Sequence, residues 1–267
     1  MKKQTNNRLS EAEFKTCMLE VLEVVANYCD EQNLTYFLAY GTLLGAVRHK
    51  GFIPWDDDVD IMMPREDYNK LVKHFNRTND RYQLVDLSVN KQYYLPFAKV
   101  YDTHTRVKEP VKPTMELGVY LDVFPIDELG NDKEAARKFQ SSLGFKRNLL
   151  MAKLNPWHKN RSLKNNITCF LASCFPVSVQ TLCQKLENAW QSFSEIKGKY
   201  IGVLMYDKIF KSEWVASATQ LNFEGKVFKV PVGYHELLTV EYGDYMQLPP
   251  VEQREGQHAL VAYWKNK

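Results

Sequence analysis

The sequence lacks the cysteine and histidine motifs that mark many zinc and redox sites. Its five cysteines cannot all pair, none of them form a CxxC motif, and its six histidines include no HExxH motif. We therefore expect buried free thiols and a reducing compartment. Zinc bound by Cys169, Cys174 and Cys183 is an alternative, but their neighbours are apolar and no histidine lies nearby at the spacing of a metal ligand.

The sequence also lacks a signal peptide and a segment that could cross a bilayer. Residues 1–7 are polar, and the first apolar positions repeat at helical spacing. The apolar stretch Ile167–Val179 is too short and too interrupted to span a membrane, so we expect a buried helix there. These features predict a cytoplasmic protein. The net charge is only +3, which argues against nucleic acid as a partner over the whole surface.

Hydrophobic residues make up 45% and charged residues 25% of the 267 residues, which are ordinary values for a globular protein. The stretch Tyr36–Pro64 organises the rest of the chain. It opens with an apolar run, Tyr36–Tyr40, which predicts a buried strand, and a turn is expected at Gly41 and Thr42. A short helix should follow. The N–H groups of its first turn and the Thr42 hydroxyl would then form an anion site.

Four carboxylates follow within five residues, at Asp56, Asp57, Asp58 and Asp60. If they open a second strand, Asp58 and Asp60 lie side by side on one face, since residues two apart in a strand point the same way. Two such carboxylates repel each other unless they are hydrated or share a divalent cation. A solvated acidic turn is the alternative, but the apolar residues on both sides of the cluster favour a metal site.

These residues resemble the signature of the LicD family, which includes bacterial phosphocholine transferases and, more distantly, fukutin-type phosphoribitol transferases. The match runs over 41–49 and 52–60, and Tyr242–Met246 with the following Leu248–Pro250 resembles the family's ending. A third carboxylate, Asp122, stands in the middle of an expected strand, Val119–Asp127. The resemblance implies one nucleotidyltransferase-like α/β (α+β) domain over 1–267, with a mixed sheet. Only about 130–230 has no counterpart in the match.

The resemblance further implies transfer of phosphocholine from CDP-choline to a sugar hydroxyl of a lipid-linked glycopolymer, a teichoic acid or lipopolysaccharide precursor. Mg²⁺, with Mn²⁺ as a substitute, would be held by Asp58 and Asp60 with Asp56 nearby. Asp122 would be the general base or a ligand of a second metal. The implied substrate-binding residues are Gly41, Thr42, Leu43, Arg48, His49 and Trp55.

Three other functions stay open at this point. The donor could carry ribitol or glycerol instead of choline, or the protein could be a nucleotidyltransferase that uses a nucleoside triphosphate. The protein could also be an inactive binding scaffold, although all three carboxylates of the motif are present. Choline would require an aromatic cage, and the 15 Tyr, 14 Phe and 5 Trp residues do not say which side chains form it.

The apolar spacing in the rest of the chain predicts three further helices, one capped by Ser10 and Glu13, one over 64–76 and one over 232–242. It also predicts strands near 82–87, 95–102, 200–205 and 226–230. Between them lies a helical layer at about 132–199, with helices near 132–151, 162–175 and 178–194. Ten Lys and Arg residues against one Glu lie between 133 and 185. This layer could contact an anionic membrane, at the inner face, or a polyanionic lipid-linked acceptor, or it could be a solvated basic surface.

Overall fold

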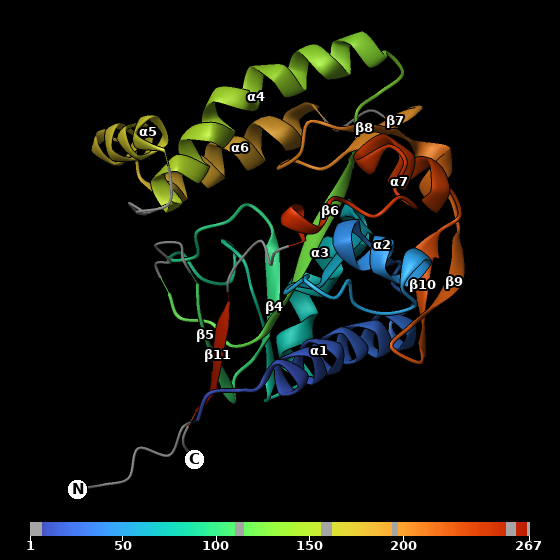
Figure 1. The fold of residues 1–267 in the computed structure, drawn as a ribbon. Helices are drawn as coiled ribbons and strands as arrows, with labels where there is room; N and C mark the ends of the chain where they lie inside the picture. The colour runs from blue at the N-terminus through green and yellow to red at the C-terminus, as the bar shows by residue number, and fades with distance from the viewer. Residues whose placement is uncertain (1–6, 110–114, 156–161, 194–196, 255–259, 266–267) are drawn as a thin grey trace, which may run out of the picture.

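The computed structural model describes residues 7–109, 115–155, 162–193, 197–254 and 260–265. Its centre is a mixed seven-stranded sheet with helices on both faces, which confirms the predicted α/β class (Figure 1). The main strand order is β1 (Phe37–Leu38), β2 (Asp60–Pro64), β6 (Tyr120–Glu128), β4 (Ala98–Asp102) and β3 (Tyr82–Val85). β7 (Tyr200–Gly202) pairs with β6 and with β8 (Ile209–Lys211). Within this sheet β2 and β6 are parallel, and the other neighbours are antiparallel.

Two helices pack on one face of the sheet. α1 (Glu11–Glu31) begins with the predicted capping box, in which Ser10 and Glu13 bond each other's backbone N–H groups. Its buried residues, with those of α3 (Arg65–His74), contact the inward side chains of β2, β4 and β6 such as Ile61, Val100 and Val123. Alternation along the strands therefore leaves Asp60 and Asp122 on the opposite face.

α2 (Tyr40–Arg48) starts earlier than the sequence suggests. The expected strand over 36–40 is only two residues long, and the expected turn at Gly41 and Thr42 is wrong because both lie in the first turn of the helix. The chain turns at Tyr40, whose φ of 45° lies in the left-handed region that few non-glycine residues adopt. The Tyr40 ring is held there by stacking on Tyr206 at 4.3 Å between ring centroids.

The predicted helical layer is present as α4 (Lys133–Leu154), α5 (Leu163–Cys174) and α6 (Val179–Phe193), and it lies along one edge of the molecule (Figure 1). α4 and α6 share a hydrophobic cluster with Tyr93 and Tyr94, which follow β3 in the chain. Arg147 of α4 is buried in this region, so its expected place on a solvent-facing basic surface is wrong.

The other strands form two separate two-stranded sheets. α7 (Tyr234–Tyr242) follows the hairpin of β9 (Ala218–Phe223) and β10 (Lys226–Pro231), and β5 (Thr105–Lys108) pairs with β11 (Val261–Trp264). Three short 3-10 helices lie at η1 (Phe75–Arg77), η2 (Ser212–Val215) and η3 (Val251–Gln253). The strands expected at 82–87, 95–102 and 200–205 are present but shorter.

All five cysteines are free. Cys17, Cys29 and Cys183 are buried as expected, whereas Cys169 is half-buried and Cys174 is exposed because α5 contacts the protein along a narrow side only. Within the described part of the chain, no single helix is long and apolar enough to cross a membrane. α5 and α6 reach that length and apolarity only as a pair, and the pair is bent by 89°.

Candidate active site

Two carboxylates from different parts of the sequence meet on the face of the sheet opposite α1 and α3. Asp60 opens β2 and is the register partner of Asp122 in the parallel strand β6. Asp60 is buried, and its N–H donates to the Thr42 hydroxyl oxygen at 2.8 Å, which ties the strand to the first turn of α2. The Asp122 N–H donates to the Val59 carbonyl at 2.9 Å. These backbone contacts fix the positions from which both carboxylates project.

The acidic segment that precedes β2 is not a strand. The prediction that Asp58 and Asp60 occupy one face of a single strand is wrong, because β2 begins only at Asp60. Asp56 lies at the N-terminus of α2: a Cβ atom added to Gly41 would be 2.4 Å from its Oδ2 atom. Gly41 is therefore required for this close approach of helix backbone and carboxylate. Asp57 has a different partner, since its Oδ2 atom accepts from the Leu260 N–H at 3.2 Å.

The electrostatics of the site show an excess of negative charge. Burial raises the pKa of Asp60 well above its usual value, and the charges of Asp58, Asp122 and Asp56 raise it further. Burial likewise raises the pKa of Asp122 to about 6, although Lys99 opposes the shift. Carboxylates that are so poorly neutralised are typical of sites where a cation or a substrate completes the charge balance.

Lys99 is a site residue that sequence reasoning missed. It is the register partner of Asp122 on β4, and its Nζ atom lies 2.6 Å from Asp122 Oδ1. The Lys99 side chain is only 4% exposed, and its ammonium lies 3.4 Å from the centroid of the Tyr120 ring. A lysine two positions after Phe97 in an apolar strand gives no local signal of this pairing, because cross-strand register is set by long-range contacts.

The acidic segment is bordered by three side chains that were predicted to bind substrate, Arg48, His49 and Trp55. Arg48 Nη1 donates to the carbonyl oxygen of Tyr245 at 2.8 Å, so this arginine holds the C-terminal segment against α2. The His49 ring lies edge-on to Trp55, with 6.2 Å between ring centroids. Arg254, which the sequence did not single out, places its guanidinium 5.5 Å from the Trp55 ring. The predicted contacts of Arg48, His49 and Trp55 with substrate stay predictions.

An aromatic group borders the carboxylates. Tyr40 stacks on Tyr206 and meets Phe124 edge-on at 5.3 Å. Burial is the main cause that raises the pKa of Tyr206, followed by the charge of Asp60. Burial also raises the pKa of Tyr242, followed by the charges of Glu241 and then Asp60. Tyr40 and Tyr242 also line a narrow pocket of about 20 Å³ with Glu241. The Oε2 atom of Glu241 is buried with no hydrogen-bond partner, and burial raises the pKa of this carboxyl.

The donor set suits a hard divalent cation, but no complete cage is preformed. In the ranges that the structure describes, no three His, Cys, Asp or Glu side chains are placed so that they could hold a metal ion together. The four-residue metal set of Asp56, Asp58, Asp60 and Asp122 is therefore not assembled, and Asp122 is bonded to Lys99. Mg²⁺ is commonly bound by one or two carboxylates together with substrate phosphates, so Asp58 and Asp60 still fit such an ion.

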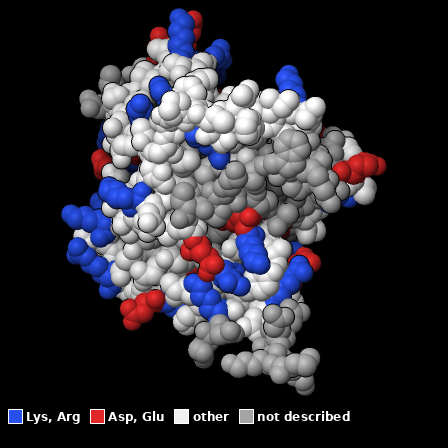
Figure 2. Space-filling view, turned by 90° about the vertical axis from the view of Figure 1, so that its left-hand side faces the viewer, with Lys and Arg blue, Asp and Glu red and all other residues white. Residues whose placement is uncertain are grey.

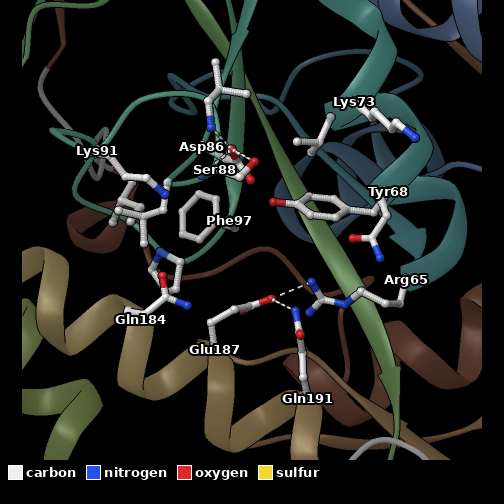
Figure 3. Close-up of a pocket in the computed structure, with 16 residues that line it drawn as sticks. Arg65, Tyr68, Lys73, Asp86, Ser88, Lys91, Phe97, Gln184, Glu187 and Gln191 are labelled. Atoms are coloured by element: carbon white, nitrogen blue, oxygen red, sulfur yellow. Dashed lines mark hydrogen bonds and ion pairs between the residues drawn. The ribbon is translucent and has the colours of Figure 1, made fainter.

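A second and larger cavity, of about 450 Å³, lies between α3, the segment 86–97 and α6 (Figure 3). Phe97 lines it and also contacts Phe124, at 4.4 Å between ring centroids. Its most buried cation, Arg65, bonds both carboxylate oxygens of Asp127 and one of Glu187. Since this guanidinium is already paired with two acids, the cavity is a poorer phosphate site than the carboxylate face of the sheet.

Comparison with known proteins identifies the family. Residues 33–148 match the model of the LicD/FKTN/FKRP nucleotidyltransferase domain, a range that contains Asp56, Asp58, Asp60, Lys99 and Asp122. The chain is 32% identical to the lipopolysaccharide cholinephosphotransferase LicD of Haemophilus influenzae over 274 residues, 96% of this chain and 98% of that protein.

Two shorter matches involve uncharacterized proteins of Rickettsia prowazekii and Rickettsia typhi. Both are 57% identical to this chain over 37 residues, which is 14% of this chain and 14% and 12% of the two proteins respectively. The long match, which covers nearly all of both chains, shows that this protein belongs to the LicD family.

Proposed function

We propose that this protein transfers phosphocholine from CDP-choline to a sugar hydroxyl of a cell-surface glycopolymer precursor, a lipopolysaccharide or a teichoic acid, and releases CMP. Membership of the family makes the chain a transferase. The Haemophilus relative is named for phosphocholine transfer to lipopolysaccharide, which supports the choline part of the proposal. The reaction would take place at the cytoplasmic side, where a nucleotide-linked donor is available.

The observation that carries the proposal is the pairing of Asp60 with Asp122 across two parallel strands, with Asp56 and Asp58 adding negative charge. In phosphoryl transfer, positioning and charge neutralisation supply most of the rate enhancement. Mg²⁺ held by Asp58 and Asp60 would neutralise the diphosphate and the leaving CMP. Gly41 lets the Asp56 carboxylate lie close to the N-terminus of α2, so donor phosphate oxygens would approach this corner through the cation and not through the helix N–H groups alone.

Asp122 is the best candidate for the base that takes the proton of the acceptor hydroxyl. Its pKa of about 6 leaves the carboxylate largely ionised at neutral pH and still basic enough to accept a proton. Lys99 stabilises the ionised form through its contact with Oδ1, so it acts as a positioning residue. The other carboxylate oxygen, Oδ2, would then face the acceptor hydroxyl.

For the choline group we propose the aromatic side chains next to Asp60. A quaternary ammonium binds to ring faces and is further stabilised by a carboxylate. Tyr40, Tyr206 and Tyr242 supply rings, and Glu241 supplies a carboxyl oxygen without a partner. The pocket itself admits little more than a water molecule, so the ammonium would lie at its mouth against Tyr242, whose side chain is exposed.

A donor screen tests the function. Purified protein with Mg²⁺ is given CDP-choline, CDP-ribitol, CDP-glycerol or a nucleoside triphosphate, and the products are identified by mass. CMP released from CDP-choline, together with acceptor carrying phosphocholine, is the expected result. Pyrophosphate from a nucleoside triphosphate would instead identify a nucleotidyltransferase, and turnover only with another CDP-alcohol would change the substrate. No product from any donor, with carboxylates intact, would favour a binding scaffold.

A further inference from the structure

Helix α5 exposes a continuous apolar stripe. Leu163, Ile167, Phe170 and Leu171 are 67%, 47%, 66% and 62% exposed, and their spacing of four, seven and eight residues places them on one side of the helix. Phe175, just beyond the helix, is 49% exposed and extends the stripe. Single exposed apolar residues are common on protein surfaces, but a contiguous group of large ones marks an interaction surface.

The protein itself does not cover this stripe. α5 rests on α4 through a narrow contact in which only Asn166 and Ala172 are buried. Its end is fixed by Lys153 of α4, whose Nζ atom donates to the Phe175 carbonyl at 3.0 Å. α6 differs, because its apolar residues Leu182, Leu186 and Trp190 are buried in the protein. The apolar composition of α5 is therefore not explained by packing within the fold.

The charge around α5 identifies the class of partner. No Asp or Glu occurs from Ala135 to Leu186, and in this interval Lys164 on α5 is exposed. Figure 2 views the molecule from the side on which α5 lies, and its upper part shows a broad uncharged area with more Lys and Arg than Asp and Glu around it. A second copy of the same face would bring cation against cation. An apolar surface bordered by cations fits an anionic lipid surface.

We propose that α5 lies flat on an anionic membrane surface, with Leu163, Ile167, Phe170 and Leu171 in the acyl boundary and Lys164 among the lipid phosphates. A helix of 12 residues is about 18 Å long, which suits an interfacial orientation and is too short to cross the bilayer. The stripe is separate from the carboxylate site, so this docking does not depend on the identity of the donor.

The test is co-sedimentation of the full-length protein with vesicles. One set contains phosphatidylcholine alone and the other contains phosphatidylcholine mixed with phosphatidylglycerol. Wild-type protein is expected to bind the anionic vesicles more tightly than the neutral ones. Phe170→Asp with Leu171→Asp should weaken that binding by roughly tenfold or more, because apolar insertion is lost and negative charge is added. Lys164→Glu should weaken binding to the anionic vesicles only.

Val227→Asp is the matched control. Val227 is also an exposed apolar residue, at 57%, but it lies on β10, away from α5 (Figure 1). This variant should bind vesicles like the wild type, and thermal melts of all variants establish that they fold. The proposal is overturned if the wild type does not bind anionic vesicles or if the α5 variants bind as tightly as Val227→Asp. It is also overturned if sedimentation velocity shows a wild-type dimer that the α5 substitutions dissociate.

Discussion

The Nζ atom of Lys99 lies 2.6 Å from Oδ1 of Asp122, and both side chains are largely buried on the face of the sheet that carries Asp60. A buried ion pair of this kind has a large effect on the protonation of its acidic partner. Here it opposes the rise in the pKa of Asp122 that burial causes, and so it keeps this carboxylate ionised at neutral pH. The catalytic competence of Asp122 should therefore depend on Lys99.

Replacing Lys99 with methionine should shift the pH profile. Without the ammonium the pKa of Asp122 rises further, so the acid limb of kcat/KM moves to higher pH and activity at pH 6.5 falls by roughly tenfold or more. Activity should recover in part at higher pH. Lys185→Met, at an exposed lysine of α6, is the control and should leave the profile unchanged. An unshifted acid limb in Lys99→Met would mean that Asp122 is not the titrating base.

Asp122→Asn should reduce the chemical step by at least about a hundredfold, as expected for loss of a general base. Donor binding should survive, because we place the phosphates at Asp58, Asp60 and the start of α2. Single-turnover kinetics and calorimetry of donor binding measure the two effects separately. If donor and metal affinity are lost together, Asp122 is a metal ligand and the base must be another residue.

The pKa of Asp60 also gives a stability prediction for the metal-free protein. Because its pKa is higher in the folded than in the unfolded state, where 3.8 is the ordinary value, its contribution to stability is greatest at low pH and declines as pH rises above about 4. Asp60→Asn should therefore raise Tm relative to the wild type by an amount that grows with pH.

The Asp60→Asn variant also tests whether the site binds a metal ion. Mg²⁺ or Mn²⁺ should raise the Tm of the wild type more at pH 7.5 than at pH 5, since a cation binds the ionised carboxylates, and should raise that of Asp60→Asn little. Transfer should be abolished in Asp60→Asn and in Asp58→Asn while both variants stay folded. Near-normal turnover in either variant would contradict the metal assignment, and a strongly reduced Tm would mean that the cluster is structural.

Glu241→Gln should raise KM for CDP-choline by several-fold to about tenfold, because it removes the negative charge that we place near the trimethylammonium group. The KM for CDP-ribitol, which has no cation, should not change. Glu236→Gln lies on the same helix α7 at an exposed position and serves as the control. An equal change for both donors would place Glu241 outside the choline site.

Arg147→Met should destabilise the protein by roughly 2 to 4 kcal/mol, because it leaves several buried carbonyl groups without a donor. Arg147 bonds the carbonyl oxygens of Leu204, Tyr206 and Gln140, and so ties α4 to the segment that carries Tyr206. The neighbouring Lys146→Met should change the free energy of unfolding by less than about 0.5 kcal/mol. Equal denaturant midpoints for the two variants would show that the buried contacts of Arg147 contribute little.

The sequence by itself determined those features that depend on spacing along the chain. The cap of α1 at Ser10 and Glu13 and the approximate extents of the helical layer were predicted from local patterns, because capping and helical periodicity act within a few residues. The family motif, with Gly41, the acidic cluster and Asp122, was likewise visible in the sequence. The long match of the whole chain to the Haemophilus relative confirms the family, whereas the roles of these residues stay predictions.

Only the tertiary structure decided which side chains face one another. The pairing of Asp122 with Asp60 and with Lys99 depends on strand register, and the burial of Arg147 depends on the segment that packs over α4. Tyr206 and Tyr242, whose pKa values are raised by burial and also by Asp60, come from more than eighty residues farther along the chain. These contacts join residues that are far apart in sequence. Their geometry depends on how the sheet and the helices pack, and the local pattern of polar and apolar residues does not specify that packing.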